Sequence, residues 1–179
     1  MSIERPYKIV IAGEKRVGKS SLVHRFIYEQ FPLKGLYSTV GFDFTLKNIT
    51  LEDNSTVIVH IFDFGGEPRF RKIFPQYAAD CDGLLLAFDP SREETFDLLH
   101  EWIKVYGRES ESVNFIVSTK SDLGVSIDPV KINEFRNKYN IDEYYQTSAV
   151  TGENTDEVFK KIALAILRKQ TDRASKKKD

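Results

Sequence analysis

The chain has 179 residues, 41% of them hydrophobic and 30% charged, which is ordinary for one soluble globular domain with a full hydrophobic core. The 26 Lys and Arg residues almost balance the 27 Asp and Glu residues, so the net charge of −1 gives no electrostatic reason to expect nucleic acid as a partner. The single cysteine, Cys81, excludes an intramolecular disulfide and a cysteine zinc site, and we expect it to be a small core residue in a reducing compartment.

The sequence contains no signal for export or membrane insertion. The N-terminal apolar run is too short for a signal peptide and leads into a glycine turn. No apolar stretch approaches the roughly 20 residues that a membrane helix needs. We therefore expect a cytoplasmic protein.

Short apolar runs bounded by turn residues predict strands along the chain. The run at 42–50 alternates more than the others, as an edge strand does, and the turn at 53–55 predicts a hairpin with the next run. The predicted strands are residues 7–13, 42–50, 56–64, 83–90, 113–122 and 143–149.

Helical patterns separate these runs. Apolar residues recur at helical spacing from Phe96 to Tyr106. Asp128 supplies a cap in front of Pro129, and Asn154, with an acid three residues later, begins the last helix. Strands that alternate with helices predict an α/β fold: a six-stranded, mainly parallel sheet with one antiparallel edge strand and helices on both faces.

A phosphate-binding loop is the strongest motif in the sequence. Residues 13–20 read GEKRVGKS, which matches G-x-x-x-x-G-K-[ST] between a predicted strand and a predicted helix. Gly13 and Gly18 permit the backbone angles that turn the loop amides toward a phosphate. Lys19 can reach the β and γ phosphates, and Ser20 can place its hydroxyl on Mg²⁺.

Two further segments follow the carboxyl ends of predicted strands, where ligands bind in sheets of this kind. Asp63 can hold Mg²⁺, and Gly66 lets a backbone N–H approach the γ-phosphate. In TKSD, the carboxylate of Asp122 can accept two hydrogen bonds from the guanine edge, a donor pair that adenine lacks. The aliphatic part of the Lys120 side chain can pack along the base.

Five motifs occur in the order and at the spacing that are typical of the Ras superfamily of small GTPases. The sequence resembles this superfamily, and in particular its Rab-type members. The motifs are GEKRVGKSS, YSTVGFDF, FDFGGE, TKSD and QTSA, and the resemblance covers roughly residues 6–170. It implies a P-loop NTPase G domain that binds GTP or GDP with Mg²⁺ and acts as a molecular switch in signalling and vesicle trafficking.

The same resemblance implies roles for matching positions. Thr39 would join Ser20 and Asp63 on Mg²⁺, Ala149 would donate its backbone N–H to the guanine O6, and Ser148 would support that loop. The catalytic residues would be Lys19, Thr39, Gly66 and Glu67. The residues around the nucleotide would be Glu14, Lys15, Arg16, Val17, Gly18, Lys19, Ser20, Ser21, Thr39, Gly66, Thr119, Lys120, Asp122, Ser148, Ala149 and Val150.

Glu67 is the main departure from the family pattern, because it stands where D-x-x-G-Q has the glutamine that orients the attacking water. A glutamine amide accepts and donates hydrogen bonds, whereas an ionised glutamate only accepts and brings negative charge toward the γ-phosphate. We therefore expect slow intrinsic GTP hydrolysis. The alternatives are that Glu67 is a general base, or that the chain is a binding module locked on GTP with negligible turnover. An adenine-specific ATPase or kinase is disfavoured by Asp122.

Other departures concern the phosphate loop and the guanine motif. Lys15 and Arg16 occupy positions that are commonly small in the family; they could replace an activating partner's arginine finger, pair with Glu67, or point into solvent. Thr119 replaces the commoner asparagine, and Val150 replaces a lysine.

Two switch segments are expected at residues 31–40 and 64–77, ordered by the γ-phosphate. Effectors, exchange factors and activating proteins would bind at residues 31–44 and 64–77, where aromatic side chains could form an apolar patch. We expect a monomer with one domain over 1–170 and a flexible basic tail over 171–179. The chain ends KKKD without a prenylation cysteine, so weak or no direct membrane contact is expected.

Overall fold

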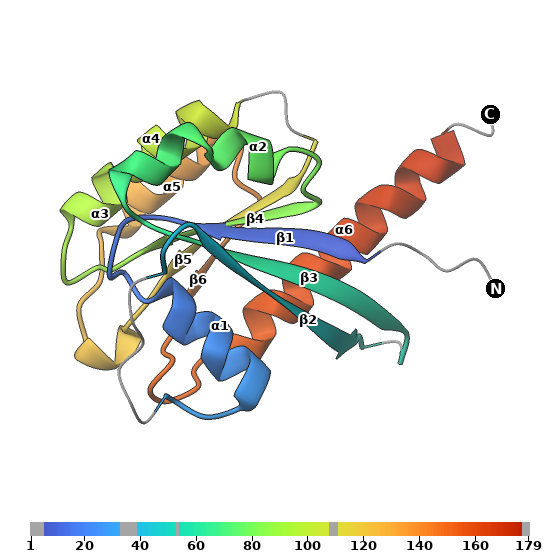
Figure 1. Ribbon diagram of the computed structural model, residues 1–179, viewed down its shortest axis with the longest axis horizontal. Coiled ribbons are helices and arrows are strands. Elements are labelled where there is room, and N and C mark those ends of the chain that lie inside the picture. Colours follow the sequence, from blue (N-terminus) through green and yellow to red (C-terminus); the bar gives the residue numbers. More distant parts are fainter. Residues whose placement is uncertain (1–5, 33–38, 53, 108–110, 177–179) are drawn as a thin grey trace.

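The computed structural model describes residues 6–32, 39–52, 54–107 and 111–176. Its centre is a six-stranded sheet with the strand order β2-β3-β1-β4-β5-β6. Neighbouring strands are parallel except at the edge, where β2 runs antiparallel to β3 (Figure 1). The strands are β1 (Tyr7–Ala12), β2 (Phe42–Thr50), β3 (Thr56–Phe64), β4 (Gly83–Phe88), β5 (Val113–Ser118) and β6 (Glu143–Gln146). The predicted α/β class and sheet type are confirmed.

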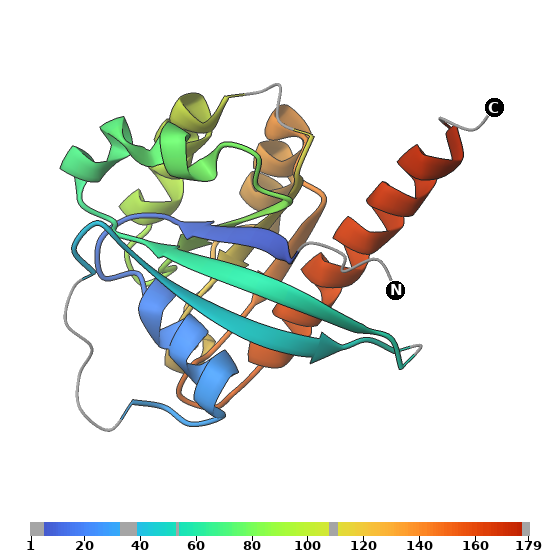
Figure 2. The same cartoon turned by 45° about the vertical axis from the view of Figure 1, so that its right-hand side comes forward.

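Helices cover both faces of the sheet. α1 and α6 lie against one face, and α2 to α5 lie against the other (Figures 1 and 2). The α-helices are α1 (Lys19–Tyr28), α2 (Phe74–Ala78), α3 (Glu94–Asp97), α4 (Leu99–Tyr106), α5 (Pro129–Tyr139) and α6 (Thr155–Lys176). Two short 3-10 helices follow strand ends, namely η1 (Pro68–Lys72) and η2 (Ser121–Leu123).

The central strand β1 shows why both faces must be covered. Ile9 and Ile11 belong to the core under α1 and α6, whereas Val10 and Ala12 belong to the core on the opposite face. All four side chains are completely buried. A continuous apolar run is the pattern of a parallel strand that is buried on both sides.

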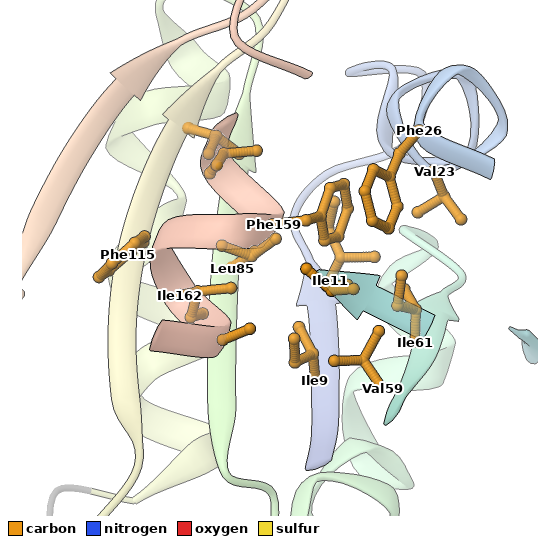
Figure 3. Packing of buried hydrophobic residues seen from close by; sticks show 14 of the residues in the cluster. Ile9, Ile11, Val23, Phe26, Val59, Ile61, Leu85, Phe115, Phe159 and Ile162 are labelled. Atoms are coloured by element: carbon orange, nitrogen blue, oxygen red, sulfur yellow. The ribbon is translucent and has the colours of Figure 1, made fainter. Parts of the chain in front are cut away.

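The core between α1, α6 and the sheet is shown in Figure 3. Ile9, Ile11 and Ile61 of the sheet face an aromatic pair from the two helices. Phe26 of α1 and Phe159 of α6 stack with ring centroids 4.2 Å apart. Removing either ring should cost about 3–5 kcal/mol, because the cavity it leaves is fully enclosed. This packing fixes α1, and with it the loop that precedes α1.

The helix ends differ in part from those predicted. Asp128 caps α5 as expected, since its side chain accepts a hydrogen bond from the Val130 N–H at 2.8 Å. The backbone carbonyl of Asn154 accepts the first hydrogen bond of α6, so the helix begins there as expected. The Asn154 side chain, however, does not cap the helix, because it donates to the Gln146 carbonyl at 2.8 Å.

Helix α6 also continues beyond the boundary expected at residue 170. It runs to Lys176. Arg173 in this extension pairs with Glu111 at 2.9 Å, and Lys169, just before it, donates to the Ser112 carbonyl at 3.1 Å. The expected tail is therefore helical as far as Lys176, and residues 177–179 lie outside the described part of the chain. Among the described residues, none of the helices combines the length and apolar composition that a bilayer crossing requires.

Cys81 lies in the core, as predicted. It is 7% exposed, its sulfur lies 3.0 Å from the Tyr106 hydroxyl, and burial raises the pKa of its thiol from 9.0 to about 11. Because the thiolate is the reactive form, alkylation by iodoacetamide at about pH 8 should be at least a hundredfold slower in the folded chain than in the urea-unfolded chain. Mass spectrometry of timed samples measures both rates, and equal rates would contradict a buried, protonated Cys81.

Candidate nucleotide and metal site

The phosphate-binding loop lies between β1 and α1, and its two glycines adopt backbone conformations that other residues avoid. Gly13 has φ +145° and Gly18 has φ +103°. A Cβ at Gly13 would lie 2.0 Å from the Ala87 carbonyl oxygen, so only glycine fits there. The loop is thus held against the end of β4 and turns directly into the N-terminus of α1, where its amides favour an anion.

Lys19, the first residue of α1, is folded over this loop. Its ammonium donates to the carbonyl oxygens of Gly13 at 2.9 Å and Glu14 at 2.8 Å. Burial lowers the pKa of Lys19 from 10.5 to about 8, against the opposing charges of Asp63 and Glu14. The lysine is only 6% exposed, so its charge acts at short range on whatever occupies the loop.

Three predicted metal ligands meet beside Lys19. The Ser20 hydroxyl lies 2.9 Å from the Thr39 hydroxyl, which lies 3.2 Å from Asp63 Oδ2. Asp63, next to the last residue of β3, is in register with Ile11 near the end of β1, which explains how residues 20 and 63 come together. Burial raises the pKa of Asp63.

These three residues fit Mg²⁺. Asp63 Oδ1 is buried and has no hydrogen-bond partner within the described ranges, which leaves a hard oxygen free for a cation. Within those same ranges no cluster of three or more His, Cys, Asp or Glu side chains could hold a metal. A cation here would have one carboxylate, two hydroxyls and the oxygens of a bound phosphate as ligands. Mg²⁺ suits such a site, because it is usually bound through one or two carboxylates together with substrate phosphates and waters.

Glu67 lies beside the phosphate loop and is not isolated. Its Oε1 is 3.4 Å from Lys15 Nζ, and its Oε2 is 2.8 Å from Arg69 Nε. The Glu67 side chain is 23% exposed, whereas Lys15 and Arg69 are 45% and 65% exposed, so each pair is worth at most about 1 kcal/mol. The pairing matches one of the interpretations left open by the sequence, in which Lys15 offsets the charge of Glu67. Arg16 is exposed with φ +63°, and within the described part of the chain the two ion pairs of Glu67 involve Lys15 and Arg69 instead.

The guanine motif gathers around Asp122. Ser148 donates its hydroxyl to Asp122 Oδ1 at 2.5 Å, which joins the loop after β6 to the loop after β5. Thr119 is buried and donates to the Phe88 carbonyl at 3.0 Å. Lys120 binds the phosphate loop, because its ammonium lies 3.3 Å from the Arg16 carbonyl oxygen.

A residue that the sequence reasoning missed holds Lys120. Asp89, completely buried at the end of β4, forms an ion pair with the Lys120 ammonium. Although burial opposes ionisation, the hydrogen bonds from Lys120 and Ser91 lower the pKa of Asp89. Arg92, in the same loop, donates to the Lys15 carbonyl at 3.1 Å. Asp89 could have been found, since it ends a buried strand as Asp63 does.

A cavity of about 510 Å³ connects much of the predicted site. Its lining residues are Lys15, Arg16, Gly18, Lys19, Ser20, Ser21, Thr39, Gly66, Glu67 and Lys120. Asp122 and residues 148–150 are not among the lining residues, and Lys120 links the two groups. Val17 is buried, and the Glu14 side chain points away from the cavity toward α4. Of the first switch, residues 33–38 lie outside the described part of the chain.

Comparison with known proteins identifies the family. A sequence model of the Ras family matches residues 8–168. The chain is also similar to the "Ras-related protein Rab-5B" of Plasmodium falciparum (isolate 3D7), with 34% identity over 162 residues that cover 89% of this chain and 77% of that protein. The chain therefore belongs to the Ras family of GTP-binding small GTPases and is Rab-like.

Proposed function

We propose that the protein is a guanine nucleotide switch that binds GTP or GDP with Mg²⁺ and hydrolyses GTP slowly. The observation that carries the proposal is the convergence of Ser20, Thr39 and Asp63 beside the buried Lys19. Hard oxygen donors next to a phosphate loop suit a Mg²⁺-bound triphosphate and few other ligands.

The residues of this chain divide the work of binding. The loop amides and Lys19 hold the β and γ phosphates, Ser20, Thr39 and Asp63 hold the cation, and Asp122 accepts hydrogen bonds from the guanine edge. Mg²⁺, when bound, would neutralise charge that develops on the phosphates. Thr39 belongs to the first switch, so its contact with Ser20 and Asp63 would join that switch to the nucleotide state.

Slow hydrolysis is expected because Glu67 cannot donate a hydrogen bond to the developing charge at the γ-phosphate. Its contacts with Lys15 and Arg69 reduce but do not remove the repulsion, since both cations are largely exposed. The variant Glu67→Gln should hydrolyse GTP roughly tenfold faster in a single turnover, which corresponds to about 1.4 kcal/mol of removed repulsion. Phosphate release from the preloaded chain measures both rates.

The same assay decides between the open alternatives. A native rate equal to or above that of Glu67→Gln would rule out the slow-enzyme hypothesis and favour Glu67 as a general base. No measurable release from either protein would favour a module locked on GTP. Lys15→Gly distinguishes the role of the neighbouring cation: a slower rate means that Lys15 offsets the charge of Glu67, and an unchanged rate means that it does not.

We further propose that effectors and regulators bind the surface formed by residues 39–44 and 64–77. Phe44 is 60% exposed on β2, and Phe42 packs on Tyr77 with ring centroids 4.3 Å apart, so the two segments share one aromatic surface. Replacing GDP by a non-hydrolysable GTP analogue should change amide hydrogen exchange in these segments. Identical exchange in both states would argue against a switch surface here.

A further inference from the structure

The side chain of Glu14, the first variable residue of the phosphate loop, points into the protein and not into the phosphate cavity. Its Oε1 accepts a hydrogen bond from Trp102 Nε1 of α4 at 2.9 Å. The same oxygen forms an ion pair with the Arg71 guanidinium of η1. The side chains of Glu14 and Arg71 are 12% and 18% exposed, and Trp102 is completely buried. The carboxylate therefore joins the phosphate loop, the second switch segment and α4.

The segment from Gly66 to Arg71 touches Glu14 at both of its ends. At the start, a Cβ on Gly66 would lie 2.4 Å from the Glu14 carbonyl carbon, so the two backbones are in direct contact. At the end, Arg71 holds the Glu14 carboxylate and lies over the Trp102 ring at 5.3 Å from its centroid. Glu67 lies between these two anchors. The position of Glu67 beside the phosphate loop thus depends on both contacts with Glu14.

Glu14 also contacts Lys19, the lysine that is expected to bind phosphate. Its carbonyl oxygen accepts a hydrogen bond from the Lys19 ammonium at 2.8 Å. A triphosphate in the loop would compete for that ammonium, since a phosphate oxygen carries more negative charge than a carbonyl. The backbone of Glu14 would then lose a partner, and its carboxylate would shift between Arg71 and Trp102. One residue therefore connects the phosphate-binding lysine with the second switch segment.

We infer that Glu14 and Arg71 are positioning residues for the proposed hydrolysis: they hold the segment 66–71 in place, and Trp102 reports on this contact. The inference rests on the proposed function, because it assumes that the loop binds GTP. Arg71 Nε is buried without a hydrogen-bond partner in the described ranges, so the guanidinium depends on Glu14 for its pairing. Trp102 is the only tryptophan in the chain, which makes its fluorescence specific to this contact.

The experiment uses the full chain loaded with GDP or with a non-hydrolysable GTP analogue, with bound nucleotide quantified by chromatography. Trp102 emission should differ between the two states in the native chain, and Arg71→Met should abolish this difference. Arg71→Met should also slow single-turnover GTP hydrolysis roughly tenfold while GTP affinity changes less than about twofold. The matched control is Lys104→Met, an exposed cation on α4, the helix that carries Trp102, which should retain both the emission difference and the rate.

Glu14→Gln is the second variant, in case Arg71→Met does not fold. The amide keeps an oxygen acceptor for Trp102 but lacks the charge that holds Arg71, so the emission difference should shrink and hydrolysis should slow. A folded Arg71→Met or Glu14→Gln with native emission and native rate would overturn the inference. So would failure of both variants to fold, because the role would then be purely structural. If chromatography found no nucleotide bound to the native chain after loading, that result would instead contradict the proposed function itself.

Discussion

Replacing Asp122 by alanine should weaken GTP binding by roughly a hundredfold to ten-thousandfold. The carboxylate would accept two charge-assisted hydrogen bonds from the guanine N1–H and amino group, each worth about 1.5–3 kcal/mol. Alanine leaves both donors of the base without a partner. Titration of the nucleotide-free chain with a fluorescent GTP derivative measures the loss. ATP binding should stay weak, since the substitution adds no contact for adenine.

Two controls separate base recognition from damage to the loop. Ser148 would keep a hydrogen bond from the Thr151 N–H at 3.1 Å after the loss of Asp122, so the loop after β6 should persist. Ser148→Ala keeps the Asp122 carboxylate that would bind the base, so it should reduce affinity much less than Asp122→Ala. Asp128→Ala removes an exposed aspartate that caps α5, which should cost about 1 kcal/mol of stability without changing GTP affinity. An Asp122→Ala chain that binds GTP as the native chain does would contradict the assignment of the guanine site.

Lys19→Met should weaken GTP binding by roughly a thousandfold. A cation about 4 Å from a phosphate charge is worth about 4 kcal/mol at the effective dielectric of a protein site. The methionine side chain has similar length and suits a buried position, since Lys19 is only 6% exposed. The loop should therefore keep its packing while losing its charge. Isothermal titration of the nucleotide-free variant with GTP and Mg²⁺ gives the change in affinity.

The matched control for this variant is Lys161→Met on α6. Lys161 pairs with Glu52 at 2.9 Å on the surface, so its loss should change stability little and leave GTP affinity unchanged. Similar losses of affinity in the two variants would show that the effect comes from the overall charge of the protein. A small loss in Lys19→Met alone would show that the loop holds phosphate mainly through its amides.

The strands were predictable because their signals are local. Residues 42–50 and 56–64 were predicted with the boundaries that β2 and β3 have, since alternation and a turn between them determine both ends. The phosphate loop was equally clear, because glycines at two set positions, a lysine and a hydroxyl follow a buried run. The convergence of Ser20 and Asp63 followed from the rule that parallel strands end at one edge of the sheet.

The remaining contacts depend on distant residues and could not be predicted. Trp102 reaches Glu14 across 88 positions of sequence, and no periodicity marks that pairing. The sequence suggested that Glu14 faces the nucleotide, whereas its side chain is turned toward α4. The flexible tail expected over 171–179 depends on a distant contact too: a polar sequence suggests fraying, but the structure is helical to Lys176 and Arg173 pairs with Glu111.

The most direct test of the account is a competition measurement on the native chain stripped of nucleotide. Labelled GDP is bound with Mg²⁺ and then displaced by increasing GTP or ATP. A site built around Asp122 and the phosphate loop should release the label at a GTP concentration at least roughly a thousandfold below that of ATP. Displacement by GTP and ATP at similar concentrations would contradict the central claim that this chain recognises guanine.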